Sequence, residues 1–324
     1  MGLETTNAPL LVWNNDIILA QVIGYLHSST DSLYSVSLTS KRGWCYAIPV
    51  LWEKPLLKRI NKFRLLVDTA GHKLPINLGD YSYYGELLRT LNLTMLAARW
   101  DLVDYNSLSK LFQHSHKLKS LDINLCSNIR SSEFEQMFSS NIEMCKSLES
   151  FYLSETKFSV ISMQRVLKMM PNIVELDLSF TMANDELLST IPESCPKIRH
   201  LYLESCLDIT SYGIEDVVNE CVELNQLNLL GCPYFSDVEN VESHGIDLEW
   251  DGAGFDEDDD GSSDFSDEFS DDDDFHGAEL SGLILDDNGD IVRGPAVIHL
   301  GDDTDEDNYS SDEDSYSYDE DFVS

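Results

Sequence analysis

The sequence predicts an α/β protein in which a solenoid of parallel strands with outer helices lies between a small helical module and an acidic tail. Three observations predict it. A short apolar phrase recurs six times, residues 8–55 carry helical apolar patterns, and residues 251–324 consist mainly of Asp, Ser and Gly.

The repeated phrase is an apolar residue, two variable positions, an apolar residue, one variable position and an apolar residue. Its copies step by 30, 30, 25, 25 and 26 residues, which is typical of a solenoid that lays one short strand beside the previous one. A doubly wound sheet is the alternative, and it fits the regular step less well. The copies begin at Leu88, Leu118, Leu148, Ile173, Ile198 and Leu224.

A small residue stands three positions after each of the last five copies. This pattern resembles the cysteine-containing leucine-rich repeat, and further cysteines precede three of the phrases. We expect each small side chain to pack inside the turn and to donate to a backbone carbonyl. The slot holds Cys126, Thr156, Thr181, Cys206 and Cys232, and the preceding cysteines are Cys145, Cys195 and Cys221.

Between the phrases, apolar residues recur at spacings of three and four, which predicts helices on the outside of the strands. They are Phe134, Met137, Phe138 and Ile142, then Met163, Val166, Leu167 and Met170, and then Val217, Val218 and Cys221.

The N-terminal segment predicts a small helical module. Residues 16–26 form an amphipathic helix, a second apolar segment follows a polar break, and an aromatic-rich stretch ends at Pro49 and Pro55, which we expect at helix ends. Such a short segment buries only a small hydrophobic core by itself. We therefore expect it to complete that core by packing against a partner protein or by capping the solenoid.

The same segment resembles an F-box in the order and spacing of Tyr25-Leu26, Asp31-Ser-Leu33, residues 37–41, Trp44 and residues 48–52. It departs from that family at Asn14-Asn15-Asp16, where Leu-Pro and an acid are usual. The resemblance implies a three-helix F-box that docks on the adaptor subunit of an SCF-type (cullin-based) ubiquitin ligase. The adaptor-binding residues that it implies are Ile18, Leu19, Val22, Ile23, Leu26, Leu33, Leu38, Trp44, Pro49, Leu51 and Trp52.

We therefore divide the chain into an F-box at 8–55, a connector at 56–87, repeats with a C-terminal cap at 88–250 and an acidic, mostly disordered tail at 251–324. In the connector we expect residues 56–60 to continue a helix and residues 71–84 to be rich in turns. Residues 245–250 supply the capping strand. Within the tail, residues 283–292 predict a hairpin around Asn288-Gly289.

Composition excludes several functions. The net charge is -38, with 28 acids against one Arg in residues 251–324, and phosphate binding needs a basic face, so we expect no nucleic-acid partner. No apolar run is long enough to span a membrane. Seven cysteines without a Cys-x-x-Cys pair or a secretory signal favour reduced thiols in the cytoplasm or nucleus and no metal. No catalytic motif occurs, so we expect a non-catalytic protein without a cofactor.

Outward residues of successive strands stack into columns, because neighbouring strands lie about 4.8 Å apart. Large amphipathic side chains among acids suit recognition of a basic protein. The predicted substrate-binding residues are Tyr152, Glu175, Asp177, His200, Tyr202, Glu204 and Asn228.

Two functions agree with these patterns. The first is the substrate receptor of an SCF-type ligase, which binds the adaptor, cullin through it, and a protein substrate. The second is a chaperone-like binder of basic proteins such as histones, because repeats followed by an acidic tail resemble the acidic leucine-rich nuclear phosphoproteins. The helical segment at residues 8–55 favours the first, because that second family begins directly with repeats.

Overall fold

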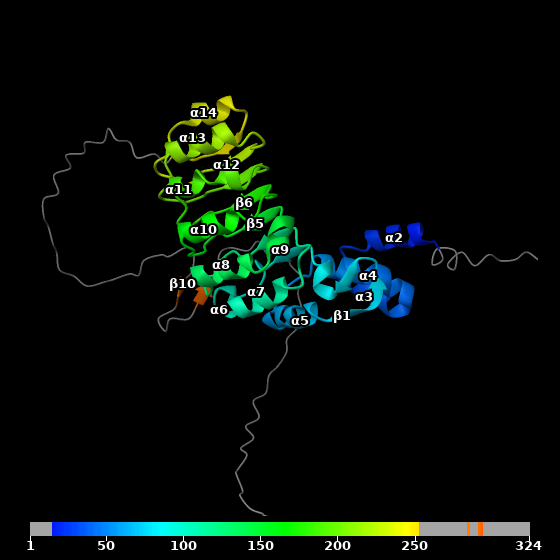
Figure 1. Ribbon diagram of the computed structural model, residues 1–324. Coiled ribbons are helices and arrows are strands. Elements are labelled where there is room, and N and C mark those ends of the chain that lie inside the picture. The colour runs from blue at the N-terminus through cyan, green and yellow to red at the C-terminus, as the bar shows by residue number, and fades with distance from the viewer. Residues whose placement is uncertain (1–14, 253–283, 286–290, 294–324) are drawn as a thin grey trace, which may run out of the picture. The chain divides into compact units, whose positions relative to one another are not determined.

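The computed structural model describes residues 15–252, 284–285 and 291–293 (Figure 1). The chain divides into two compact units, Met1–Asp260 and Gly261–Ser324. The first unit contains the N-terminal helices and the solenoid, and the second contains one described strand pair.

Three helices open the described chain: α2 (Asp16–Tyr25), α3 (Thr30–Thr39) and α4 (Lys41–Glu53). The Asn15 side chain caps α2 by accepting from the N–H groups of the first turn, and Ser40 caps α4 in the same way. α3 and α4 approach closely at Gly43, where an added Cβ would lie 2.5 Å from the Val36 carbonyl oxygen. These helices enclose a small core of Leu19, Ile23, Leu33 and Ala47.

Pro49 lies inside α4 and does not end it, contrary to the sequence expectation. Proline removes one hydrogen bond and crowds the preceding turn of a helix. Packing of Leu51 on the small core and of Trp52 on the solenoid core carries the helix past Pro49. Pro55 does follow the end of the helix.

The connector is more regular than its sequence predicts. Residues 54–59 form a non-helical segment instead of continuing a helix, and α5 (Ile60–Ala70) begins after them. The segment expected to be rich in turns forms an antiparallel pair, β1 (Lys73–Leu78) and β2 (Tyr81–Tyr83), before the 3₁₀ helix η1 (Tyr84–Leu87). The buried face of α5 belongs to the same core as the repeats.

The solenoid sheet has seven parallel strands in sequence order. Sequential order excludes the doubly wound alternative, because that arrangement would interleave its strands. Each register step pairs equivalent repeat positions, and the expected capping strand forms the last pair. The strands are β3 (Thr90–Asn92), β4 (Ser120–Asp122), β5 (Ser150–Tyr152), β6 (Glu175–Asp177), β7 (His200–Tyr202), β8 (Gln226–Asn228) and β9 (Asp247–Glu249).

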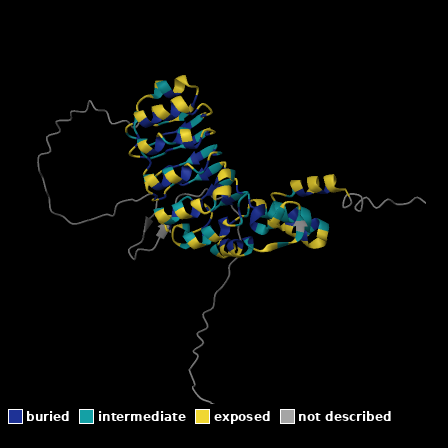
Figure 2. Ribbon diagram, viewed as in Figure 1, coloured by how far each residue is buried: buried dark blue, intermediate teal, exposed yellow. Residues whose placement is uncertain are grey.

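Helices cover one face of this sheet, with their inner sides buried and their outer sides exposed (Figure 2). Every predicted helical core residue is buried except Ile142, because a helix ends at Ser139 and a new one starts at Ile142 with that side chain outward. The helices are α6 (Arg99–Leu102), α7 (Tyr105–Phe112), α8 (Ser131–Ser139), α9 (Ile142–Ser147), α10 (Val160–Leu167), α11 (Asp185–Leu188), α12 (Ile191–Ser194), α13 (Ser211–Glu220) and α14 (Val238–Ser243).

The helical module joins the solenoid as if it were a preceding repeat. Along β4 to β8, the residue before each strand donates its N–H to the equivalent carbonyl of the preceding repeat, as Lys119 does to Arg89 at 2.7 Å. Arg89 in turn donates to the carbonyl of Glu53, the last residue of α4, at 2.9 Å. The ring of Trp52 packs 4.9 Å from that of Tyr84. The end of α4 thus covers the first edge of the sheet.

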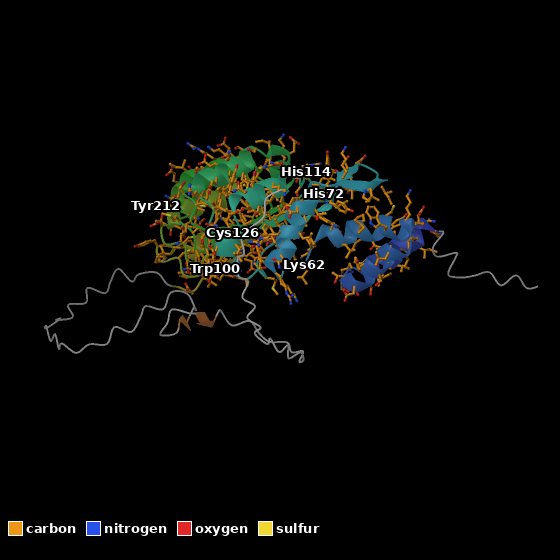
Figure 3. The ribbon with its side chains drawn as sticks, turned by 90° about the horizontal axis from the view of Figure 1, so that it is seen from below. Lys62, His72, Trp100, His114, Cys126 and Tyr212 are labelled. Atoms are coloured by element: carbon orange, nitrogen blue, oxygen red, sulfur yellow. The ribbon has the colours of Figure 1, made fainter. Side chains whose placement is uncertain are left out.

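A left-handed residue follows each of β4 to β8, and the predicted small residue comes directly after it. Glu155 and Ser205 have φ of 57° and 54°, and Gly231 has 68°. Four of the five small side chains, those of Thr156, Thr181, Cys206 and Cys232, donate as expected. The thiols of Cys206 and Cys232 donate to carbonyls of the preceding repeat at 3.2 and 3.1 Å. Thr156 bonds the Leu153 carbonyl of its own repeat at 2.6 Å. Cys126 lies among the strands and helices (Figure 3).

In the second unit, β10 (Ile284–Leu285) and β11 (Ile291–Arg293) pair antiparallel, as the hairpin prediction requires. The predicted Asn288-Gly289 turn and the predicted disordered character of residues 253–283 and 294–324 lie outside the described residues. No described helix has the length and apolar character needed to cross a membrane.

At the positions with positive φ, introducing glycine and removing glycine should change the free energy of unfolding in opposite directions. Glu155→Gly should keep or raise the free energy of unfolding, because glycine adopts positive φ without the steric cost of about 1 kcal/mol. Gly231→Ala should lower it, since the new Cβ would lie 2.8 Å from Ser205 Oγ. Urea unfolding measures both. Glu215→Gly in α13 is the control and should cost about 1 kcal/mol, and a larger loss at Glu155 would contradict the prediction.

The buried cysteines predict loss of stability in alkali. Burial raises the pKa of the Cys206 thiol from an ordinary 9 to about 12. It raises the pKa values of four other buried thiols to about 12 as well, those of Cys126, Cys145, Cys195 and Cys221. Only the unfolded thiols ionise between these values. The contribution of each buried thiol to the free energy of unfolding is therefore fully present below about pH 9. Above that pH it falls by about 1.4 kcal/mol per pH unit for each thiol.

Cys206→Thr tests this, because threonine fills the same slot at Thr156. Urea unfolding from pH 8 to 10 should show a shallower decline for the variant. Native thiols should also resist alkylation until the chain unfolds. Equal slopes for both proteins, or rapid native labelling of Cys206, would show that these thiols are not protected by the fold.

Candidate protein-binding surfaces

The face of the sheet opposite the helices carries the predicted substrate residues. In β3 to β8 the middle side chain is buried and its two neighbours point outward, so the register stacks outward residues into columns. One column is Thr90, Ser120, Ser150, Glu175, His200, Gln226 and Asp247, and the next is Asn92, Asp122, Tyr152, Asp177, Tyr202, Asn228 and Glu249.

Glu175 lies at the centre of the cluster that the columns form. The Tyr202 hydroxyl is 3.5 Å from Glu175 Oε1 and 3.5 Å from Gln226 Oε1. His200 Nδ1 is 3.0 Å from the same Gln226 oxygen. Gln226 was not among the predicted substrate residues, although its place in the His200 column is readable from the repeat period.

The two tyrosines of this cluster stay neutral donors at physiological pH. Burial, followed by the hydrogen bond and the charge of Glu175, raises the pKa of Tyr152. Burial and the same carboxylate raise the pKa of Tyr202. Each therefore presents an apolar ring and a protonated hydroxyl beside a carboxylate, which suits contact with a cation.

Asp177 and Asn228 have a structural task in addition to any contact. Asp177 Oδ1 accepts the Ser179 N–H at 2.9 Å, and Asn228 Oδ1 accepts the Leu230 N–H at 3.1 Å, each stabilising the turn that follows a strand. Asn92 and Asp122 do the same. Tyr152 and Tyr202 occupy this column without an acceptor of that kind, so they are its exceptions.

Glu204 lies just after β7 and continues this surface towards the edge where the strands end. Its carbonyl accepts the Phe180 N–H at 2.7 Å, which places Phe180 of one repeat beside Glu204 of the next. The structure therefore brings all seven predicted residues onto β5 to β8 and the turn after β7. Their contact with a substrate stays a prediction.

An apolar edge borders this surface and was missed at the sequence level. Met182 and Leu207 occupy the same repeat position, two residues after the left-handed residue, and are 59% and 61% exposed. A bridge between Asn184 and Asp208 shows that these loops run side by side. Phe180 and Tyr234 are also exposed. The sequence signal that could have predicted this edge is the recurrence of an apolar residue at one fixed loop position of adjacent repeats.

The predicted adaptor-binding residues divide by burial. Leu19, Ile23 and Leu33 are inside the small core, Leu26 and Leu51 pack on it, and Trp52 packs on the solenoid core. Trp44 and Pro49 are half-buried. Ile18, Val22 and Leu38 are exposed, as are Ile17, Tyr25 and Tyr34, which the prediction omitted.

The exposed members lie on α2 and on α3, and α2 is mainly exposed along its length (Figure 2). Tyr25 is 84% and Leu38 69% exposed. Asp16 forms an ion pair with Arg42 and a hydrogen bond with Tyr46, and both partners hold its pKa below the usual value. These contacts tie α2 to α4 and leave the apolar side chains outward.

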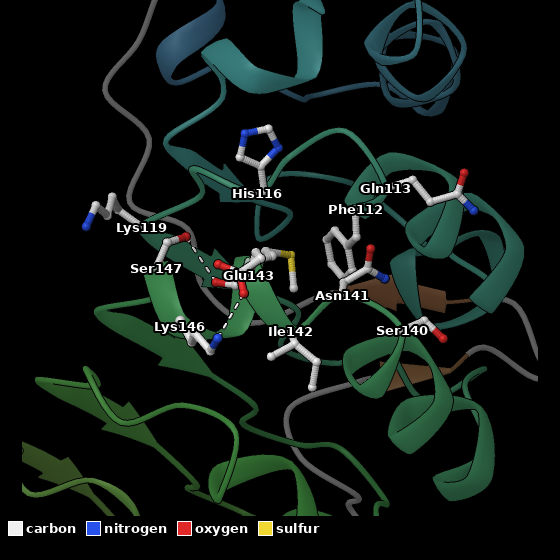
Figure 4. Close-up of a pocket in the computed structure, with 11 residues that line it drawn as sticks. Phe112, Gln113, His116, Lys119, Ser140, Asn141, Ile142, Glu143, Lys146 and Ser147 are labelled. Carbon is white, nitrogen blue, oxygen red and sulfur yellow. Dashed lines mark hydrogen bonds and ion pairs between the residues drawn. The ribbon is translucent and has the colours of Figure 1, made fainter. Parts of the chain in front are cut away.

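A third feature is a surface hollow of about 920 Å³ beside α9 (Figure 4). Several of its polar groups already have partners: Lys146 pairs with Glu143 at 2.8 Å, and Ser147 Oγ donates to the Leu118 carbonyl at 2.6 Å. None of the predicted substrate residues lines it. Within residues 15–252, 284–285 and 291–293, no group of three or more His, Cys, Asp or Glu side chains could hold a metal ion.

Comparison with known proteins gives weak structural likenesses. No family model and no curated protein matches the chain. Among solved structures, the yeast Rad7 and Elc1 complex has 17% identity and a TM-score of 0.38, covering 77% of this chain and 73% of that one. Internalin C2 from Listeria monocytogenes has 14% identity and a TM-score of 0.40, covering 68% and 92%.

A TLR13–ssRNA13 complex has 20% identity and a TM-score of 0.33, covering 50% of this chain and 23% of that chain. This chain thus spans about a quarter of the TLR13 chain's length. Likenesses of this size carry no functional assignment, so function rests on the chain's own residues.

Asp122 offers a test of the turn that follows each strand. Burial raises the pKa of its carboxyl, so the charged form is disfavoured, while its Oδ1 accepts the Asn124 N–H at 3.1 Å. Asp122→Asn should keep the acceptor, remove the buried charge and leave stability equal or higher at pH 7. Asp122→Ala should cost about 1 kcal/mol through the lost hydrogen bond. Urea unfolding that ranks alanine equal to asparagine would contradict this role.

Proposed function

We propose that this chain is the substrate-recognition subunit of an SCF-type ubiquitin ligase. Helices α2 to α4 dock on the adaptor, and the outward face of the sheet binds a protein substrate. The single observation that carries the adaptor half is the exposure of the large apolar side chains Ile17, Val22, Tyr25, Tyr34 and Leu38 on α2 and α3 of a module with a four-residue core.

That surface suits an apolar partner. Val22 and Tyr25 lie three residues apart on α2, and Tyr34 and Leu38 lie four apart on α3, so each helix exposes an apolar stripe. Such stripes are typical of protein interaction sites, and covering them releases water. The order of Tyr25-Leu26, Trp44 and residues 48–52 resembles an F-box and supports the adaptor as that partner. The burial of Leu19, Ile23 and Leu33 assigns them to holding the module together.

In this role the chain performs no chemistry. It raises the effective concentration of a bound substrate near the ligase, which can enhance the reaction without any catalytic group of its own. The rigid connection between α4 and the first strand, through the Glu53 carbonyl and Trp52, supports such a role, because it limits how far the substrate surface can move from the adaptor.

A binder of basic proteins outside any ligase is the second candidate. The acids along β6 to β9 and the 28 acids of residues 251–324 favour it. The two candidates differ in the partner of α2 and α3. Affinity purification followed by mass spectrometry should recover adaptor and cullin if the first is correct, and only basic clients if the second is.

The adaptor proposal predicts that polar substitution of the exposed surface abolishes adaptor binding without unfolding the module. In Val22→Ser/Tyr25→Ser/Leu38→Ser, adaptor binding measured by calorimetry should weaken at least about tenfold. Ile23→Ala should instead lower stability by about 2–5 kcal/mol, because it empties part of the small core.

The matched control is Ile161→Ser/Tyr212→Ser/Val222→Ser, which removes three exposed apolar side chains from the repeats. It should bind the adaptor like the native chain. Equal binding by both triple variants, with circular dichroism unchanged, would show that the adaptor does not use α2 and α3.

A further inference from the structure

We propose that the substrate segment recognised by this chain is basic and carries an apolar residue beside its Lys or Arg. It binds across β6 to β9 and the loop edge next to them. This inference rests on the proposed role of the sheet face as the substrate surface, and it names the chemistry that this surface selects.

Charge on the sheet face is one-sided in its second half. Five acids point outward from β6 to β9 or from the turn after β7, and none of the outward positions of these strands is Lys or Arg. Within the described part of the chain, no Lys or Arg forms an ion pair with these acids. They are Glu175, Asp177, Glu204, Asp247 and Glu249.

The first half of the face differs. The outward strand positions of β3 to β5 hold Asp122 as their one acid, and its side chain is buried. Burial raises the pKa of Asp122, the Arg99 charge offsets part of that rise, and Arg99 donates to the Asn124 carbonyl at 2.8 Å. An attractive field for a cation is therefore concentrated on β6 to β9.

The Glu175 cluster gives this field a place to hold a single cation. Its carboxylate lies near the hydroxyls of both Tyr152 and Tyr202. A Lys or Arg side chain reaching Glu175 would make a charge-assisted hydrogen bond and contact a tyrosine ring. Both interactions are stronger for a cation than for a neutral side chain.

The apolar loop edge sets the second requirement. Phe180 lies directly beside Glu204, and Met182 and Leu207 follow at one position of adjacent repeats. An apolar side chain of the bound segment would cover these residues while its basic neighbour meets the acids. A purely basic segment would leave them exposed, so the edge discriminates among basic proteins.

Charge also decides against other occupants. The chain's own residues 251–324 carry 28 acids and one Arg, so they would be repelled by this face. Nucleic acid would be repelled for the same reason. A separate basic protein segment is the occupant that this surface attracts.

Fluorescence anisotropy with labelled synthetic peptides and the full chain tests the inference. The peptides are basic-apolar (Arg, Lys and Leu), basic-polar (Arg, Lys and Ser) and acidic-apolar (Asp, Glu and Leu). The basic-apolar peptide should bind most tightly, the basic-polar peptide more weakly and the acidic one least. Binding of both basic peptides should weaken as salt is raised.

Paired variants locate the binding. Glu175→Gln/Glu204→Gln should weaken both basic peptides about tenfold, whereas Glu215→Gln/Glu239→Gln on α13 and α14 makes the same charge change elsewhere and should have no effect. Met182→Ser/Leu207→Ser should weaken only the basic-apolar peptide. The corresponding control is Ile161→Ser/Val222→Ser, which should leave all three peptides unchanged.

Photo-cross-linking of the basic-apolar peptide separates this surface from the acidic tail. Cross-links should map to β6–β9 and the adjacent loops. Cross-links confined to residues 251–324, or equal losses in both glutamine variants, would overturn the inference. Adaptor binding is measured in parallel: retained adaptor binding with no peptide preference refutes this inference alone, whereas a native chain that does not bind the adaptor refutes the proposed function.

Discussion

The structure depends on hydrogen bonds that each repeat can complete only with the next one. After β6 the Phe180 N–H donates to the Glu204 carbonyl, and after β7 the Ser205 N–H donates to the Leu230 carbonyl. The buried backbone of one repeat is therefore satisfied only when its neighbour is in register. This requirement makes stability a property of adjacent repeats and explains why the end strands need special partners.

The two ends of the solenoid differ in how they are closed. At the first edge, the Glu53 carbonyl and Trp52 of α4 occupy the place of a missing repeat. At the last edge, β9 presents the exposed acids Asp247 and Glu249, and charge on an edge strand discourages pairing with other chains. The same two acids extend the acidic surface, so one feature protects the edge and contributes to the proposed recognition.

The repeats satisfy the turn after each strand in two ways. Asn or Asp in the column accepts the turn N–H within its own repeat, as Asp177 does for Ser179. After Tyr152 and Tyr202 the preceding repeat supplies the acceptor: Asn124 Oδ1 accepts the Ser154 N–H at 2.7 Å, and Ser179 Oγ accepts the Glu204 N–H at 3.2 Å. The column position of these two repeats is thereby open to a large amphipathic side chain, and both tyrosines lie around Glu175.

The sequence by itself determined the repeat register. The phrase places its middle residue inward and its neighbours outward, so the period alone assigns Leu176, Glu175 and Asp177 to their faces. It also determined the burial of Cys206 and Cys232, because a small residue at a constant position after a strand has one place to go. These are local consequences of a period, and a period is visible in a single chain.

Only the tertiary structure decided which apolar residues of the N-terminal helices are inside. Ile18 and Val22 lie four residues apart, and so do Leu19 and Ile23, so the pattern defines one broad apolar face. Packing against Leu33 and Ala47 buries the second pair and leaves the first outward. The continuation of α4 through Pro49 likewise follows from contacts with segments distant in sequence, which no local pattern records.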